Sequence, residues 1–475
     1  MASNRDQLQS YQFVLTRMMH ALVLRETDPE HPPFRRGIIA MLVGVGLAIL
    51  ALVGVGVYGL INPGGKTSWQ SGDAVIVEKE TGTRYVYSDG VLYPTANYTS
   101  ALLLTDSYSE PVMVSQKSLL GVPRGPRIGI PHAPDSVPTE ERLLDTDWSL
   151  CAQPTSDAAG DPKVRSVLLV GREPDAARTV EDAALLVSDP DGRRYLVWRG
   201  HRHRIAEHAT VSAGLALDSE TWLSVSPAWL DTIPSGPTLG PIDVPDPGSP
   251  SRLLPSGRVG SLYVVHTSGG HEQYYLLLKD RLRALTPLQY DIQRSAPATR
   301  EAYDTATPEA IELDPAMVAD RSDGHELASP TDSALPANRP SFARPGSKSD
   351  AVCAVFGDGG YQPRFTIAAE LPTSGKSAVT AGSGPGGLPL ADRVVVPPGH
   401  GAVVETMAAP DQPAGSGALA FVSDLGRRHQ VADRKVLGVL GYEKPPIIRL
   451  PAELVSRIPA GDPLDPESAI RPLGP

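Results

Sequence analysis

Residues 37–61 read GIIAMLVGVGLAILALVGVGVYGLI, a long apolar run without a charged side chain that decides the fold class of this chain. A bilayer core is crossed by roughly 20 apolar residues in a helix. Lipid offers the backbone no hydrogen-bond partner, so a segment that crosses it must be helical. The alternative is a signal peptide, but the run begins well inside the chain and Asn62-Pro63-Gly64-Gly65 follows it instead of an Ala-x-Ala-like cleavage site. We therefore predict one transmembrane helix over residues 37–61.

The basic residues around this segment are unevenly distributed. Arg25, Arg35 and Arg36 precede it, whereas only Lys66 lies close behind it. The positive-inside rule keeps residues 1–36 in the cytoplasm and places everything behind the helix outside. The sequence predicts a single-pass protein of the plasma (inner) membrane, with a cytoplasmic N-terminus and a periplasmic, extracytoplasmic C-terminal ectodomain.

The cytoplasmic segment is predicted to contain an amphipathic helix. Its large apolar side chains recur at spacings of three and four, which places them on one face. They are Leu8, Tyr11, Leu15, Met18 and Leu22. A single helix has no core of its own, so this face must pack on a protein partner, on a second copy or on the inner leaflet. Because the helix carries few basic residues, we favour protein over lipid, and we add Arg17 to the candidate partner-binding residues.

Small residues also recur along the membrane segment. Ala40, Gly44 and Ala48 form a small-x-x-x-small row, which allows two helices to approach closely. The whole segment is rich in glycine and alanine, so composition alone is the alternative explanation of the row.

Composition sets limits on the ectodomain. A chain of 475 residues is too long for one core, so we expect two or more folding units outside the membrane. The net charge is −11 with acidic and basic residues interspersed. No basic stripe is available to neutralise phosphates, which excludes nucleic acid as an expected partner.

The chain has two cysteines, Cys151 and Cys353, and both fall on the exported side. An even count in an oxidising compartment predicts one disulfide. The alternative is a pair of buried free thiols.

The ectodomain shows internal repetition, with β-meander patterns near residues 75, 184, 262 and 419. A second element, an apolar turn followed by Pro-x-Gly, lies downstream of three of them, at Pro123, Pro234 and Pro459. Two further stretches that carry the cysteines are predicted to form a central domain from discontinuous pieces. The predicted parts are the cytoplasmic helix and linker (1–36), the membrane helix (37–61), repeat 1 (62–125), the first piece of the central domain (126–175), repeat 2 (176–245), repeat 3 (246–334), the second piece of the central domain (335–408), and repeat 4 with the tail (409–475).

Catalytic motifs are weak in this sequence. Gly64-Gly65-Lys66-Thr67 resembles the end of a phosphate-binding loop, but Leu60 stands where that motif needs its first glycine. His201 and His203 alternate as metal ligands could, yet no supporting carboxylate follows, and a solvated basic strand is the preferred interpretation. Pro398-Gly399-His400-Gly401 is interpreted as a turn between strands. We therefore predict no enzyme, no cofactor and no metal.

Asn97-Tyr98-Thr99 matches a glycosylation sequon. Because it follows a predicted strand and turn, we interpret it instead as the start of a helix.

Several segments closely resemble the EccB family, membrane components of the actinobacterial type VII (ESX) secretion system. They are the N-terminal text from Gln9 to Arg25, the single membrane segment, the unit that begins at Val77, and Leu120-Gly-Val-Pro-Arg-Gly125 with its continuation to Pro134. The cysteine pair also fits the family, whereas Thr16-Arg17 departs from its usual Arg-Arg.

The resemblance implies an elongated α+β ectodomain of four repeat units around a disulfide-linked central domain. It also implies a multiprotein complex with EccC-, EccD- and EccE-like subunits and a mycosin-like protease. We accordingly predict a structural subunit of the secretion inner-membrane complex that docks through its N-terminal helix and forms homo-oligomers. The alternatives are an extracytoplasmic nucleotide hydrolase (ATPase) and a cell-wall-binding ectodomain.

Overall fold

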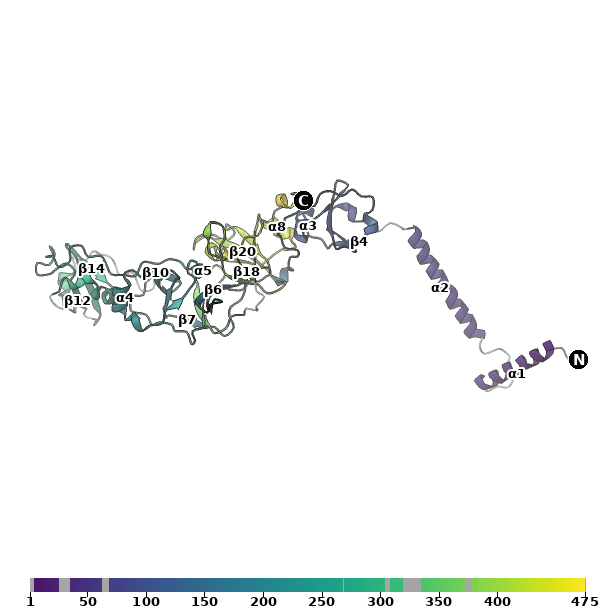
Figure 1. Ribbon diagram of the computed structural model, residues 1–475, viewed down its shortest axis with the longest axis horizontal. Coiled ribbons are helices and arrows are strands. Elements are labelled where there is room, and N and C mark those ends of the chain that lie inside the picture. The colour runs from purple at the N-terminus through teal and green to yellow at the C-terminus, as the bar shows by residue number, and fades with distance from the viewer. Residues whose placement is uncertain are drawn as a thin grey trace. The chain divides into compact units, whose positions relative to one another are not determined.

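The fold is described from a computed structural model of the chain (Figure 1). The residues described are 4–24, 35–61, 68–267, 269–303, 308–318, 335–372, 378–380 and 382–474. These residues fall into two compact units. One contains the described residues up to 70 with the segments 78–81 and 113–122, and the other contains the remaining described residues.

Two long helices come first in the chain, α1 (Asn4–Leu24) and α2 (Arg35–Ile61). Within α2, residues 37–57 form a membrane-spanning candidate with a mean hydropathy of 2.9, and none of it is buried in the protein. Apolar side chains exposed in this way are penalised by water, and a lipid bilayer removes that penalty. The predicted transmembrane helix over 37–61 is therefore confirmed as an apolar helix of sufficient length.

The described part of the ectodomain contains four four-stranded sheets and one seven-stranded sheet. The first small sheet consists of β1 (Ile76–Glu78), β2 (Arg84–Ser88), β3 (Val91–Pro94) and β4 (Val112–Val114), and the second of β8 (Leu185–Ser188), β9 (Arg194–Trp198), β10 (His201–Arg204) and β11 (Leu223–Ser224). The third consists of β12 (Leu262–His266), β13 (Glu272–Leu277), β14 (Leu282–Leu285) and β15 (Ile311–Glu312). The fourth consists of β20 (Ala402–Met407), β21 (Leu419–Val422), β22 (Arg428–Val431) and β23 (Ile447–Pro451). The predicted mixed, sheet-rich ectodomain is thus confirmed.

All four small sheets have the same strand order. Three strands form an antiparallel meander, and the fourth returns to lie beside the first. Where the register is known, this fourth strand runs parallel to the first, as β11 does to β8 and β23 to β20. A parallel return needs a crossover segment, which each sheet fills with a helix. These crossover helices are α3 (Tyr98–Thr105), α4 (His208–Leu215), α6 (Pro287–Arg294) and α8 (Arg434–Val439).

Polar caps start three of these helices. Asn97 accepts a hydrogen bond from the Ser100 amide, and its own side-chain amide donates to the Ile130 carbonyl. The interpretation of the sequon as a helix start is therefore correct, and Asn97 is buried. Thr286 forms a capping box with Gln289, and Asp433 caps α8. Such caps satisfy amides at a helix start that have no partner within the helix.

The three Pro-x-Gly segments share one structural role. Each adds a short parallel bridge to the third strand of its sheet, pairing Arg124 with Leu92, Ser235 with Arg202, and Ala460 with Arg428. In each case the residue after the proline lies opposite the strand, and the glycine amide donates to the strand's carbonyl at 2.8–2.9 Å. The glycine is required because a ring covers it.

Those covering rings are Tyr93 over Gly125, His203 over Gly236 and His429 over Gly461. A Cβ atom at any of these glycines would overlap the ring. His203 and His429 are buried, and each Nδ1–H donates to a backbone carbonyl, of Pro237 and Asp462 respectively, at 2.9 Å. The interpretation of the His201–Arg204 strand as solvated is thus wrong for His203, which faces the Pro-x-Gly segment.

The seven-stranded sheet has the order β18-β19-β6-β5-β16-β17-β7. Its strands are β5 (Trp148–Ser156), β6 (Pro162–Leu169), β7 (Arg178–Val180), β16 (Ala351–Phe356), β17 (Arg364–Ala368), β18 (Ala378–Val379) and β19 (Arg393–Val395). They come from two stretches of chain that are separated in sequence by the second and third small sheets. The short strand β7 lies just beyond residue 175, where the sequence analysis ended the first piece.

The remaining elements are short helical turns. They are α5 (Pro227–Leu230), α7 (Pro297–Arg300), α9 (Ala452–Val455), α10 (Pro466–Ala469), η1 (Ser68–Ser71), η2 (Gln116–Leu119), η3 (Glu140–Arg142), η4 (Leu217–Ser219), η5 (Pro315–Met317) and η6 (Pro385–Gly387).

Hydrophobic cores link neighbouring sheets within the larger unit. One core joins the seven-stranded sheet to the second and fourth small sheets, with the rings of Trp229 and Phe365 6.0 Å apart. A second core joins the first small sheet to the fourth, through residues such as Leu102 and Phe421. Burial of these large side chains is the main stabilising contribution, worth about 2 kcal/mol for each one fully removed from water.

Candidate functional site

The exposed apolar face of α1 is the first candidate site. Its five predicted residues are 43–82% exposed, with Leu15 the least and Leu22 the most exposed. Their positions repeat with the three-and-four spacing of a coiled-coil seam, which suits packing against another helix. The structure thus leaves this face uncovered in the described residues.

Sequence analysis missed three further apolar side chains on α1. Phe13, Val14 and Met19 are also exposed, and they widen the apolar surface beyond one stripe. Arg17 lies over the Phe13 ring, with 5.8 Å between its guanidinium carbon and the ring centroid. The three-and-four spacing selects only one face of a helix, and α1 carries apolar side chains on more than one face. A count of all its apolar residues would have identified these three.

Among the described residues, nothing packs closely against the middle of the small-residue row on α2. A Cβ atom added at Gly44 would meet nothing within 4 Å. The row of Ala40, Gly44 and Ala48 therefore stays a prediction about helix packing in the membrane.

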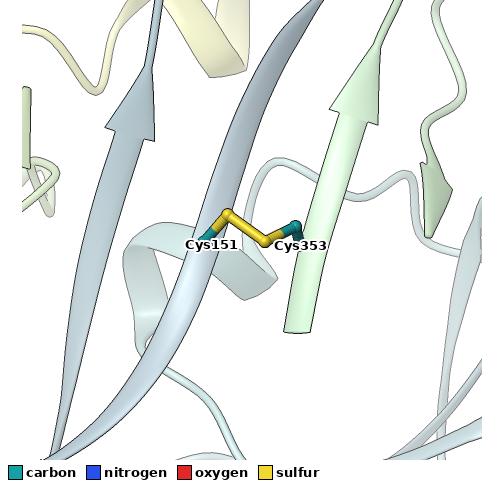
Figure 2. Close-up of a disulfide and its surroundings, with 2 residues drawn as sticks. All are labelled: Cys151 and Cys353. Atoms are coloured by element: carbon teal, nitrogen blue, oxygen red, sulfur yellow. A yellow bond between two sulfur atoms is a disulfide. The ribbon is translucent and has the colours of Figure 1, made fainter. Parts of the chain in front are cut away.

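The disulfide lies in the middle of the seven-stranded sheet. Cys151 on β5 and Cys353 on β16 are directly opposite each other in the antiparallel register, with their Cα atoms 3.9 Å apart. Figure 2 shows the two sulfur atoms bonded between the neighbouring strands. Both residues are fully buried, beside Val167 and Val355. The bond joins the two separate pieces of chain that build this sheet.

The sequence motifs considered for catalysis do not form one site in the described residues. Gly64-Gly65-Lys66-Thr67 lies outside the described residues. Among the described residues, no group of three or more His, Cys, Asp or Glu side chains could hold a metal ion. The loop at Gly399 is a turn with a positive φ of 70°, and its amide donates to the Asp424 carboxylate at 3.1 Å. Together with Arg142 and Phe421, this loop lines a cavity of about 300 Å³.

The chain combines an exposed apolar helix, one membrane helix and a sheet-rich, disulfide-linked ectodomain. This arrangement is that of a membrane-anchored component of a larger assembly. The sequence matches the family described as "Type VII secretion system ESX-1, transport TM domain B" over residues 1–472. The chain therefore belongs to the EccB family of type VII secretion proteins, as the resemblance predicted.

Relatives and solved structures are consistent with this assignment. The chain is 27% identical to the ESX-3 secretion system ATPase EccB3 of Mycolicibacterium smegmatis, over 96% of this chain and 88% of that one. It is 30% identical to the ESX-2 secretion system ATPase EccB2 of Mycobacterium tuberculosis, over 66% of this chain and 62% of that relative's length. The alignment with that relative thus spans less than two thirds of its length.

Two solved structures share the fold. The EccB3 dimer from the ESX-3 core complex matches with a TM-score of 0.62 and 25% identity, covering 84% of this chain and all of that one. A chain of an intact ESX-5 inner membrane complex matches with a TM-score of 0.63 and 24% identity over all of this chain and 96% of that one. Family membership and these neighbours support the predicted role as a structural subunit of the secretion inner-membrane complex.

The prediction that the chain is not an enzyme is contradicted. The curated relatives EccB2, EccB3 and EccB5 are all named as secretion system ATPases. The prediction rested on an incomplete phosphate-binding motif, and such a motif covers only one of the ways in which a protein can hold a nucleotide.

Proposed function

We propose that this chain anchors and organises the membrane complex of a type VII secretion system, with α1 as its cytoplasmic docking element. The observation that supports this most directly is the exposed apolar face of α1, next in the chain to the membrane helix. Its exposed side chains would be costly in water at about 25 cal/mol per Å² of apolar surface. A helical partner from a cytoplasmic subunit removes that cost.

The proposal includes the orientation of the chain. Residues 1–36 lie in the cytoplasm, and the residues behind α2 lie outside, as the basic residues at its start favour. The EccC-, EccD- and EccE-like subunits and the mycosin-like protease that the resemblance implies are its proposed partners.

The four small sheets are the proposed repeat units. Their shared strand order, crossover helix and, in three of them, Pro-x-Gly bridge support this interpretation. The seven-stranded sheet corresponds to the proposed central domain. We place boundaries between these parts near residues 125, 245 and 334. The boundaries that the sequence analysis placed at 175 and 408 have to move, because β7 (Arg178–Val180) belongs to the seven-stranded sheet and β20 (Ala402–Met407) to the fourth small sheet.

Association between copies of the chain is part of the same proposal. It is supported by the solved EccB3 dimer, whose chain is covered completely by the match to 84% of this chain. Native mass spectrometry of the full-length protein in detergent tests it directly, since a chain that does not associate would give the monomer mass alone.

The docking role of α1 is tested by mild-detergent purification of the tagged full-length protein with mass spectrometry of what co-elutes. We expect an FtsK/SpoIIIE-type ATPase and a polytopic membrane protein to co-elute, and both to be lost when Leu15 and Met18 are changed to Asp. The matched control places the same two charges at Gln9 and Thr16, outside the stripe of Leu8, Tyr11, Leu15, Met18 and Leu22. Equal recovery of both partners with the wild type, the Leu15 and Met18 variant and the control variant would refute docking through the apolar face.

ATP hydrolysis is the second candidate function, and the names of the relatives favour it. Phosphate release from ATP by the purified full-length protein tests it, with and without Mg²⁺. Loss of turnover in Lys66→Ala would assign the activity to the segment Gly64–Thr67, and turnover unchanged in that variant would place it elsewhere in the chain.

A further inference from the structure

The second small sheet carries a cavity that none of the roles above uses. It has a volume of about 360 Å³ and lies between the face of β9 and β10, the helix α5 and the Pro-x-Gly segment that follows α5. We call it the arginine pocket after Arg193, Arg202 and Arg204, which line it together with Leu230, Ser235 and Thr238.

Two of the three arginines are balanced by carboxylates. The buried Asp189 accepts from the Arg193 amide at 2.9 Å and from its Nε at 2.7 Å. Asp231 accepts from an Arg202 Nη at 2.7 Å. An Nη of Arg193 also donates to the exposed carboxylate of Asp191, which lies outside the lining of the cavity, at 2.5 Å. Arg193 is thus paired with two carboxylates and Arg202 with one.

Among the residues that line the cavity, three arginines face two carboxylates, and Arg204 is the arginine without a carboxylate of its own. It is exposed, and no carboxylate among the described residues pairs with it. Arg202 and Arg204 are two residues apart on β10, so their side chains leave the same face of the sheet. The pocket therefore offers an uncompensated guanidinium beside two others.

The fold itself does not require this pair of arginines. The parallel bridges to the Pro-x-Gly segments make Arg202 equivalent to Leu92 in the first small sheet and to Arg428 in the fourth. Two residues on, Arg204 is equivalent to Pro94 and to Gln430. Because the first and fourth sheets have the same strand order with Pro94 or Gln430 at this position, the strand order does not require the charge of Arg204.

We propose that the arginine pocket binds a phosphate group. Guanidinium groups bind oxyanions through paired, charge-assisted hydrogen bonds. Three of them around one cavity, with the hydroxyls of Ser235 and Thr238, suit the tetrahedral oxygens of a phosphate better than the two coplanar oxygens of a carboxylate. The group belongs either to a free phosphate monoester or to a phosphodiester within a polymer. The proposal is independent of secretion and of ATP hydrolysis.

The test is a titration of the full-length protein in detergent with inorganic phosphate, in which isothermal calorimetry at constant ionic strength measures the binding. We expect saturable binding of inorganic phosphate, weakened about tenfold or more in Arg204→Ala because a hydrogen bond to a charged group is lost. Arg283→Ala, which removes an exposed arginine from the third strand of the next small sheet, should bind like the wild type. Thr238→Val is a second variant that leaves the charge unchanged and should weaken binding by a smaller factor.

A second titration with dimethyl phosphate separates the two sources. Binding of dimethyl phosphate as tight as that of inorganic phosphate supports a diester within a polymer, and preference for inorganic phosphate supports a monoester. Absence of saturable binding of both anions to the wild type overturns the proposal. So does equal weakening in Arg204→Ala and Arg283→Ala, which would indicate only general attraction between charges.

Discussion

At the scale of single residues, the most demanding positions are the glycines of the three Pro-x-Gly segments. Each lies under a ring and donates its amide to the third strand of its sheet. The sequence showed that these motifs recur, but it could not show why. The reason is the ring of Tyr93, His203 or His429, which occupies the space where any other residue would place its Cβ atom.

Replacement of Gly461 by alanine should destabilise the protein. The new methyl group overlaps the His429 imidazole, and overpacking of this kind costs about 1–3 kcal/mol. The control is Gly438→Ala in α8 of the same sheet, where a Cβ atom meets nothing within 4 Å. That change should be neutral or stabilise the helix by up to about 1 kcal/mol. Denaturant unfolding of both variants measures the difference, and equal stability would argue against the overlap.

The buried His429 should make stability depend on pH. Burial holds the pKa of this imidazole below its usual range, although the Asp462 carbonyl partly opposes the shift. In the unfolded chain the ordinary pKa is about 6.5, so below that pH the unfolded state binds more protons than the folded state. Stability is therefore complete above about pH 6.5 and decreases as the pH falls toward the lowered pKa.

The measurement is unfolding free energy at several pH values between 5 and 8 for the wild type and His429→Gln. The unfolding free energy of the variant should decrease less at acidic pH than that of the wild type. Burial also lowers the pKa of His208, which should account for part of the decrease that remains. His400, on an exposed turn, provides the control substitution. An identical pH dependence in wild type and His429→Gln would show that the imidazole is protonated without penalty.

At the scale of elements, the seven-stranded sheet depends on two distant pieces of chain. The disulfide between Cys151 and Cys353 closes a loop with a sequence separation of 202 residues. Removing this cross-link frees the unfolded chain, and the chain-entropy treatment gives an upper value of about 5 kcal/mol for a loop of that length.

Replacing both cysteines by alanine should therefore lower the free energy of unfolding by about 2–5 kcal/mol. Chemical denaturation with and without a reducing agent checks this. The wild type should lose stability on reduction, and the double variant should be insensitive to the reductant. A wild type that is equally stable when reduced would mean that burial of these residues, and not the bond, holds the sheet together.

Elements also differ in how far the sequence predicts them. Meander strands near residues 75, 184 and 262 were recognisable, because turn residues separate alternating apolar patterns. Near residue 419 only β21 and β22 were placed in the unit, whereas its first strand, β20, was assigned to the central domain. The fourth strands were not, since β11 and β15 are each two residues long and gain their partners only through a crossover helix. The burial of His203 was also missed, because it depends on a Pro-x-Gly segment more than thirty residues away.

At the scale of the whole molecule, the membrane helix divides the chain into two chemically different parts. The short first part presents exposed apolar side chains on a helix. The long second part buries its apolar side chains in a series of linked cores. An apolar face for a partner on one side and self-contained domains on the other are what an anchoring subunit needs.

The proposed orientation of the chain, with α1 in the cytoplasm, can be measured directly. Both native cysteines are paired in a buried disulfide, so a single introduced cysteine reacts alone with a membrane-impermeant maleimide. In right-side-out membrane vesicles, Lys348→Cys on an exposed loop should be labelled and Ser10→Cys on α1 should be protected. Inside-out vesicles should give the reverse pattern, which controls for intrinsic reactivity. If Ser10→Cys were labelled from outside, the apolar face of α1 could not meet a cytoplasmic subunit, and its docking partner would have to be sought on the ectodomain side of the membrane.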